Sequence, residues 1–124
     1  MKGQTATMLG VLLIVVLVGA GQQWLANRQA DAVGPAVAAL AKPGDIRMIS
    51  SRTCGACMAA RAWFNRNQVA YSECTIETDA NCRRDFEALG SPGTPVMQVR
   101  GRNQLGFSAE ALKQALQPLG RSAS

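Results

Sequence analysis

Residues 5–21, TATMLGVLLIVVLVGAG, carry no charged side chain, and the centre of this stretch is almost wholly aliphatic. A helix of this length rises about 26 Å, slightly less than the roughly 30 Å hydrocarbon core of a bilayer. Gln22, Gln23 and Trp24 follow and extend the crossing, and tryptophan is typical of a membrane interface. The sequence therefore predicts a membrane-directed segment over residues 1–25. The rest of the 124-residue chain has room for one small domain.

Two fates of this segment fit its sequence. The small residues Val18 and Ala20 suit cleavage by a signal peptidase. The uncharged stretch continues past Ala20, which favours a retained anchor, and a helix buried in a soluble core would usually show a polar face. Positive charge at Lys2 favours a cytoplasmic N-terminus. Both fates then export the rest of the chain, which is periplasmic or otherwise extracytoplasmic if anchored and secreted if cleaved.

The segment over residues 26–44 is rich in alanine and is interrupted by one Gly-Pro and one Pro-Gly pair. Alanine favours helix, whereas these pairs interrupt it, so we expect short helical pieces that act as a linker. The folded domain is then expected over residues 45–120, followed by a short tail at 121–124.

Charge and composition exclude several functions. The 13 basic residues exceed the 8 acidic ones, but the arginines are dispersed rather than gathered into a stripe with aromatic residues, so we expect no nucleic-acid partner. The chain has no histidine, which excludes a Ser-His-Asp or Cys-His catalytic pair and any zinc site that needs imidazole. Reactive chemistry is therefore expected from the 4 cysteines.

Hydrophobic patterning after residue 44 predicts strands and helices in alternation. Ser108 suits the N-cap of the last helix. The expected strands are residues 45–51, 68–77, 94–101 and 102–107, and the expected helices are residues 54–67, 78–90 and 107–120.

Two cysteines three residues apart stand where the first of these strands turns into a helix. Cys54 is at the predicted helix N-terminus, where free N–H groups and the helix dipole stabilise a thiolate, and Arg52 adds positive charge nearby. Cys57 lies on the same face and can attack a mixed disulfide formed at Cys54. Gly55 and Ala56 between them are small, so that a substrate chain can approach the sulfur. The spacing thus predicts a nucleophile and a resolving cysteine.

The order β-α-β-α-β-β-α with a Cys-x-x-Cys after the first strand resembles the thioredoxin-like arrangement, and its short form resembles glutaredoxin. This resemblance covers residues 45–117 and implies an α/β domain in which helices flank a small mixed sheet. Three separated matches carry it: Cys54-Gly55-Ala56-Cys57, Thr94-Pro95 before the third strand, and Gly106-Phe107-Ser108 before the last helix.

The resemblance also implies substrate-binding residues. In the family, the proline that matches Pro95 is cis and faces the motif, and the residue before it, here Thr94, offers backbone groups to a substrate segment. Gly106 matches a glycine-rich turn at the same site. Glutaredoxins that bind glutathione usually carry two glycines and then an acid in this turn, and this chain has one glycine. No cofactor is therefore expected, and glutathione is the weaker candidate for the reductant.

The second pair of cysteines is spaced differently. Cys74 is near the end of the second predicted strand and Cys82 is in the first turn of the next helix. Four cysteines can pair in three ways, and we favour Cys74–Cys82 as a structural disulfide at this strand-to-helix corner. The alternative is that Cys74 is a buried free thiol and Cys82 a surface one. A relay of electrons between the two pairs is disfavoured because exchange requires direct contact of sulfur atoms.

The sequence as a whole favours a membrane-tethered thiol-disulfide oxidoreductase that exchanges disulfides with exported proteins or small thiols. The spacing leaves open whether the pair reduces, oxidises or isomerises disulfides, and a donor in the membrane is one candidate source of electrons. A soft-metal-binding module for copper or zinc is the alternative, since two thiolates three residues apart can hold such an ion. The sequence assigns no metal site, because a zinc knuckle more often has two closely spaced pairs. A purely structural role for Cys54 and Cys57 is disfavoured, because so small a loop constrains the unfolded chain little.

Overall fold

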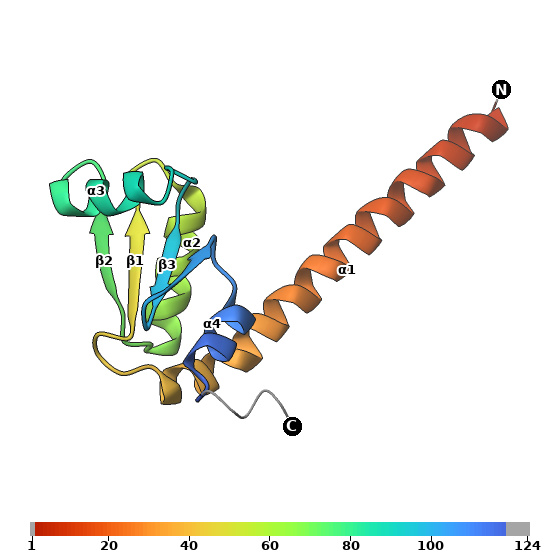
Figure 1. The fold of residues 1–124 in the computed structure, drawn as a ribbon. Coiled ribbons are helices and arrows are strands. Elements are labelled where there is room, and N and C mark those ends of the chain that lie inside the picture. The colour runs from red at the N-terminus through yellow and green to blue at the C-terminus, as the bar shows by residue number, and fades with distance from the viewer. Residues whose placement is uncertain (1, 119–124) are drawn as a thin grey trace. The chain divides into compact units, whose positions relative to one another are not determined.

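The computed structural model describes residues 2–118 and contains two compact units, one ending at Ala32 and one beginning at Val33. The expected tail at 121–124 lies outside the described residues. Figure 1 shows the fold. The elements in chain order are α1 (Lys2–Leu40), β1 (Ile46–Ser50), α2 (Gly55–Asn67), β2 (Ser72–Thr75), α3 (Ala80–Ala88), β3 (Val96–Val99), β4 (Arg102–Leu105) and α4 (Ala109–Leu116).

The N-terminal unit is the first part of the long helix α1. Its segment Lys2–Leu25 is long enough to cross a membrane, and its most apolar stretch has a mean hydropathy of 2.0. None of that stretch is buried inside the protein. An exposed aliphatic surface of this length needs an apolar environment. A membrane anchor and a signal sequence both have this character.

The segment expected to be an interrupted linker is instead continuous helix. Helix α1 runs without a break through Gly34 and Pro35 to Leu40. Gly34 has a packing role, since a Cβ there would lie 1.9 Å from Oδ1 of Asn67 at the end of α2. The following Val37 is fully buried in the core. The last turns of α1 therefore belong to the folded domain, because they pack against it, and the glycine that suggested a break permits this close approach.

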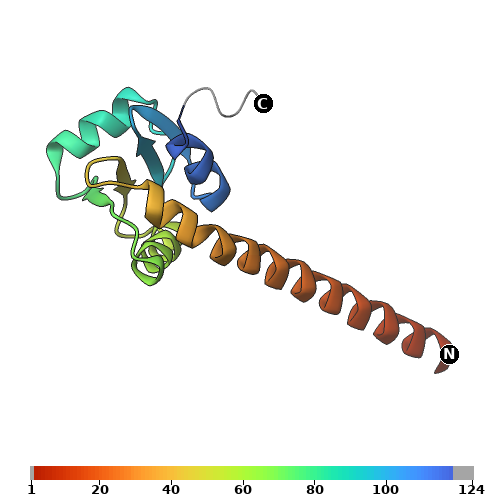
Figure 2. The ribbon, with the colours of Figure 1, turned by 90° about the horizontal axis from the view of Figure 1, so that it is seen from below.

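The domain is built on a four-stranded mixed sheet with the order β2-β1-β3-β4. The central strand β1 pairs in parallel with β2 and antiparallel with β3, and β3 and β4 form a hairpin. A parallel pair requires a crossover, which α2 supplies. Figure 2 shows α2 and α3 on opposite sides of the sheet. The domain thus has the flanked mixed sheet expected from its sequence.

Each face of the sheet packs against different helices. Ile49 and Val96 form a buried cluster with Cys82 and Phe86 of α3. Side chains alternate along a strand, so the neighbouring Met48 faces the other side, where α2 lies.

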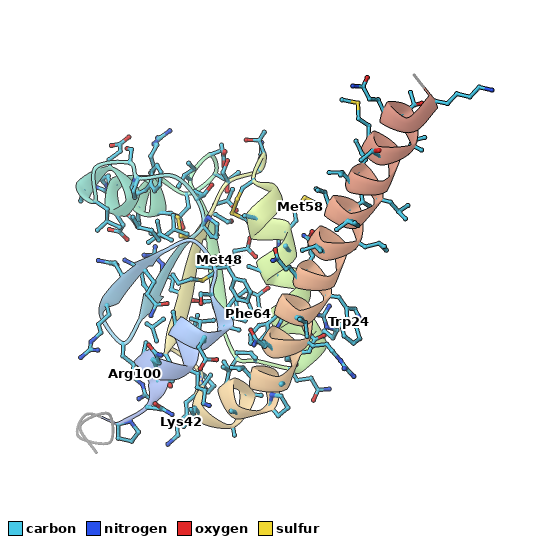
Figure 3. The ribbon with its side chains drawn as sticks, turned by 90° about the vertical axis from the view of Figure 1, so that its right-hand side faces the viewer. Trp24, Lys42, Met48, Met58, Phe64 and Arg100 are labelled. Atoms are coloured by element: carbon cyan, nitrogen blue, oxygen red, sulfur yellow. A yellow bond between two sulfur atoms is a disulfide. The ribbon has the colours of Figure 1, made fainter. Side chains whose placement is uncertain are left out.

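Aromatic side chains fill much of the α2 side. Phe64 stacks on Tyr71 with ring centroids 4.4 Å apart, and Trp63 lies 5.2 Å from Phe107. Figure 3 shows Phe64 between α2 and the rest of the domain. This packing fixes the position of α2, the helix that begins beside Cys54.

Helix ends account for the differences from the predicted boundaries. The second strand is shorter than the expected 68–77, because Gln68 adopts a left-handed conformation with φ 55° and closes α2. The last helix ends at Leu116 rather than at 120, since Gln117 is extended. The predicted N-cap is present, with the Ser108 hydroxyl accepting a hydrogen bond from the Ala111 N–H at 3.2 Å.

Candidate active site

The Cys54–Cys57 pair occupies the turn between β1 and α2. Cys54 is the N-cap of α2, and its Sγ accepts a hydrogen bond from the Cys57 N–H at 3.0 Å. The two residues form a disulfide with their Cα atoms 5.2 Å apart. Cys54 is partly exposed, whereas Cys57 is fully buried. An incoming sulfur can therefore reach Cys54 first, and Cys57 is shielded until a mixed disulfide has formed.

The Thr94–Pro95 motif lies at the same end of the sheet. Its peptide bond is cis, as the resemblance implied. Ile49 pairs with Val96, so the next antiparallel pair places Pro95 opposite Ser50, the last residue of β1 before the Cys54 turn. Pro95 is buried and Thr94 is half-buried. This register brings the Cys54 turn and the Thr94–Pro95 motif, about forty residues apart in the sequence, to the same end of the sheet.

Gly106 joins the same edge. Its N–H donates a hydrogen bond to the Pro95 carbonyl at 2.8 Å, and its φ of 78° is in the region that glycine adopts without strain. Two of the motifs that carried the resemblance are thus in contact, at the end of the sheet where the turn toward Cys54 begins. The next residue, Phe107, points into the aromatic core against Trp63.

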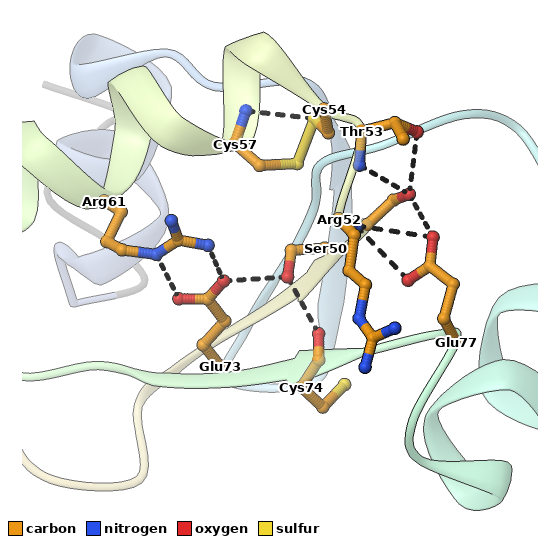
Figure 4. Close-up of a disulfide and its surroundings, with 10 residues drawn as sticks. Ser50, Arg52, Thr53, Cys54, Cys57, Arg61, Glu73, Cys74 and Glu77 are labelled. Carbon is orange, nitrogen blue, oxygen red and sulfur yellow. Dashed lines mark hydrogen bonds and ion pairs between the residues drawn. A yellow bond between two sulfur atoms is a disulfide. The ribbon is translucent and has the colours of Figure 1, made fainter.

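Arg52 is exposed, and its side chain is directed away from the Cys54–Cys57 disulfide in Figure 4. Its backbone carries the notable contact, because the Arg52 N–H donates to both carboxylate oxygens of Glu77 at 3.3 Å. The positive charge expected beside Cys54 is therefore accompanied by a carboxylate at the same turn.

Glu77 is a site residue that the sequence did not indicate. Its Oε1 also accepts a hydrogen bond from the Ser51 hydroxyl. This bond is the main cause that lowers the pKa of Glu77 below its ordinary value, so that the side chain is ionised at neutral pH. Glu77 and Ser51 are 26 residues apart, and only the parallel pairing of β1 with β2 brings them together.

A second missed group lies between α2 and β2. Arg61, one turn after Cys57, donates from Nε to Oε1 of Glu73 at 2.9 Å and makes a second bond through Nη2. The Arg61 bond is the main cause that lowers the pKa of Glu73. The buried Ser50 hydroxyl lies 2.8 Å from Oε2 of Glu73 and 3.1 Å from the Cys74 carbonyl oxygen. Figure 4 shows this group linking the active-site helix to β2.

Cys74 and Cys82 form the second disulfide, with their Cα atoms 6.0 Å apart. Cys82 is fully buried and Cys74 is half-buried, next to Ile49 and Phe86. The structure thus pairs these residues rather than leaving them as two free thiols. The bridge joins β2 to the first turn of α3, the corner at which the sequence placed it.

Comparison with known proteins gives the family. The glutaredoxin family model matches residues 46–103. A crystal structure of a point mutant of the thioredoxin-like protein BC3987 has a TM-score of 0.53 and 27% identity, covering 59% of this chain and 95% of that one. The unmutated BC3987 has 30% identity and a TM-score of 0.49 over 56% and 97% of the two chains. A glutaredoxin from Archaeoglobus fulgidus has 21% identity and a TM-score of 0.48 over 60% and 87%. No curated protein matches the chain significantly.

The chain is a glutaredoxin-like member of the thioredoxin superfamily. With its Cys54-x-x-Cys57 pair at the start of α2, it is a thiol-disulfide oxidoreductase. Within residues 2–118, no three side chains of the metal-binding types are grouped so as to hold a metal ion.

Proposed function

We propose that this oxidoreductase is held at a membrane by α1 and exchanges disulfides with exported proteins. The observation that carries the proposal is the exposed apolar segment Lys2–Leu25 on the same chain as the Cys54–Cys57 pair. The second disulfide, Cys74–Cys82, supports an oxidising compartment, because such bonds persist outside the cytosol.

The exchange follows from the unequal exposure of the two cysteines. In the reduced protein, the Cys54 thiolate attacks one sulfur of a substrate disulfide, and the other substrate sulfur leaves as a thiolate and takes up a proton. Cys57 loses its proton and attacks Sγ of Cys54, which releases the first substrate sulfur. The substrate gains two electrons and two protons, and Cys54 and Cys57 become a disulfide. The reverse sequence oxidises a substrate dithiol.

A protein substrate fits this edge better than glutathione. Gly55 and Ala56 are exposed and small, and Thr94 lies just before the start of β3, where its backbone groups can pair with an extended substrate segment. The residue after Gly106 is Phe107, which is packed against Trp63, and not an acid that would hold the amino group of glutathione. A membrane-bound donor of electrons is then the expected source of reducing power.

The proposed orientation of α1 rests on the charge at its N-terminal end. Lys2 precedes the apolar stretch and favours the cytoplasmic side. At the other end, the guanidinium of Arg28 lies 4.5 Å from the centre of the Trp24 ring, and a tryptophan suits either membrane interface, while the charge of Arg28 offsets part of the bias set by Lys2. The domain that begins at Val33 would then be extracytoplasmic.

Membrane fractionation of bacteria that express the full chain tests this proposal. We expect the intact chain in the carbonate-washed membrane fraction, and we expect protease added to spheroplasts to digest the domain. A chain that lacks residues 2–25 is the control and should stay in the soluble cytoplasmic fraction. Recovery of a product that begins at Gly21 would identify a cleaved signal peptide. Recovery of the intact chain in the soluble fraction would contradict both membrane targeting and export.

A substrate trap tests the partner class. In the Cys57→Ser variant the resolving thiol is missing, so mixed disulfides at Cys54 accumulate. We expect non-reducing gels of this variant to show adducts with exported proteins, and we expect none with the Cys54→Ser variant. Adducts made only of glutathione would contradict protein substrates.

A further inference from the structure

We propose that Glu77 positions the turn that carries Cys54, and that the Cys74–Cys82 disulfide holds Glu77 in place. The inference rests on the thiol-disulfide exchange at Cys54 and not on the membrane or on any substrate. It assigns the second disulfide a part in the reaction although its sulfur atoms exchange no electrons there.

The first step is the contact between Glu77 and the turn. Ser51 and Arg52 immediately follow β1, and their side-chain hydroxyl and backbone N–H both donate to the Glu77 carboxylate. The Cys54 N–H donates in turn to the Ser51 carbonyl at 3.3 Å. The Glu77 carboxylate thus holds Ser51 and Arg52, two consecutive residues of the turn. Cys54 is hydrogen-bonded to the first of them through its own N–H.

The second step is the loop that carries Glu77. Cys74 and Cys82 are 8 positions apart, and Glu77 lies between them. Within this loop the Ile76 N–H donates to the Ser50 carbonyl at 3.0 Å, and the Asp79 N–H donates to the Thr75 carbonyl at 3.0 Å. The disulfide closes the loop at its ends, and a short closed loop has few alternative conformations. Glu77 is therefore held close to Ser51 by a covalent bond as well as by hydrogen bonds.

The third step is the effect on Cys54. Its Sγ accepts the Cys57 N–H at 3.0 Å only while the turn aligns it with the start of α2. This alignment stabilises a thiolate, which is the attacking species. If Glu77 is removed, the turn loosens and the pKa of the Cys54 thiol rises. A purely electrostatic role predicts the opposite, because removing a nearby negative charge lowers the pKa of a thiol.

Two substitutions separate these roles. Glu77→Gln removes the charge but keeps an oxygen that accepts from Ser51 and Arg52, whereas Glu77→Ala removes both. A positioning role predicts that Gln preserves the reactivity of Cys54 and Ala reduces it. An electrostatic role predicts that both substitutions increase the thiolate fraction. Glu87→Ala, which removes an exposed carboxylate of α3, is the matched control.

The experiment uses the full chain in detergent in the Cys57→Ser background, where Cys54 is the single free thiol while Cys74 and Cys82 stay bonded. The rate of alkylation by iodoacetamide as a function of pH gives the pKa of Cys54. We expect Glu77→Ala to raise it by about one unit, so that alkylation at any pH well below the parent pKa slows about tenfold. We expect Glu77→Gln and Glu87→Ala to stay within about twofold of the parent rate.

The double variant Cys74→Ala/Cys82→Ala tests the second half of the proposal. We expect the same slowing as in Glu77→Ala, and we expect no further slowing when the two changes are combined, because both act on one contact. Additive effects, or no effect of removing the disulfide, would overturn the role of Cys74–Cys82. The comparison of Glu77→Ala with Glu77→Gln remains decisive if the double variant fails to fold.

Other outcomes are equally clear. An unchanged pKa in Glu77→Ala overturns the positioning role, and a lowered pKa in both Glu77 variants replaces it with an electrostatic one. Alkylation requires no substrate, so the failure of the chain to form adducts with exported proteins would contradict the proposed function without affecting this result.

Discussion

At the scale of single residues, two carboxylates of one strand-to-helix region tie the active-site turn and helix to the rest of the domain. Glu77 binds the turn before Cys54, and Glu73 binds Arg61 of α2. Both have a lowered pKa, for which a hydrogen bond to the ionised form is the first cause. The ionised carboxylates are therefore part of the folded state at neutral pH.

Glu73 gives a prediction for the dependence of stability on pH. Its pKa is lower in the folded chain than in the unfolded one, so its contribution is complete above the unfolded value near 4.5 and is lost as the pH falls through the folded value. We expect Glu73→Gln to lower the free energy of unfolding by about 1 kcal/mol at pH 7, a small value because Arg61 is partly exposed. Denaturant unfolding at pH 7 and below pH 4 checks this. A difference between variant and parent that does not shrink at low pH would contradict it.

Gly34 gives a prediction about packing. In an exposed helix, Gly→Ala usually stabilises by about 1 kcal/mol. Here a Cβ would approach Asn67, whose side-chain amide donates to the Trp63 carbonyl at 2.9 Å. We therefore expect Gly34→Ala to lower the melting temperature, since Asn67 must move and lose this bond.

The matched double variant Gly34→Ala/Asn67→Ala isolates the contact. With the Asn67 side chain removed, the alanine at position 34 should no longer be harmful, so the two changes should be strongly non-additive. If Gly34→Ala is harmful to the same extent in both backgrounds, the contact with Asn67 is not the reason for this glycine.

At the scale of elements, sequence patterns predicted the strands and helices of the domain and the Cys-x-x-Cys turn. They did so because each signal is local: alternation in β1, an N-cap at Ser108, two cysteines one turn apart. The missed features depend on tertiary structure. Glu77 meets Arg52 across 25 positions, and the role of Gly34 depends on the approach of α2.

The strand-to-helix corner gives a prediction about covalent structure. Peptide mass spectrometry of the non-reduced protein should find one peptide that joins Cys74 to Cys82 and another that joins Cys54 to Cys57. Mild reduction should open the Cys54–Cys57 bond first, because Cys54 is the N-cap of α2, where the helix N-terminus stabilises the thiolate that leaves. A peptide that joins a cysteine of one pair to a cysteine of the other would contradict the pairing.

At the scale of the whole molecule, the chain separates into an apolar helical unit that ends at Ala32 and a domain unit that begins at Val33. The sequence predicted this division from hydropathy but placed the start of the domain too late, because the composition of residues 33–40 resembles a linker. Part of residues 33–40 is buried only because this stretch packs against the folded domain, and such tertiary contacts cannot be read from the composition of this segment.

This separation predicts that the unit before Val33 localises the enzyme without taking part in the exchange. A chain that lacks residues 2–25 should reduce a small disulfide in solution at a rate within about twofold of the full chain in detergent. A much larger loss, with an unchanged circular dichroism spectrum of the domain, would assign the helix a role in the reaction.

The most direct test of the central claim is the turnover of a protein disulfide by the full chain, followed as release of substrate thiols with an excess of a dithiol reductant. We expect turnover by the parent and a loss of at least about a thousandfold in Cys54→Ser. We expect Cys57→Ser to accumulate a mixed disulfide with the substrate when the dithiol is left out. Activity that survives Cys54→Ser would contradict the assignment of Cys54 as the attacking group.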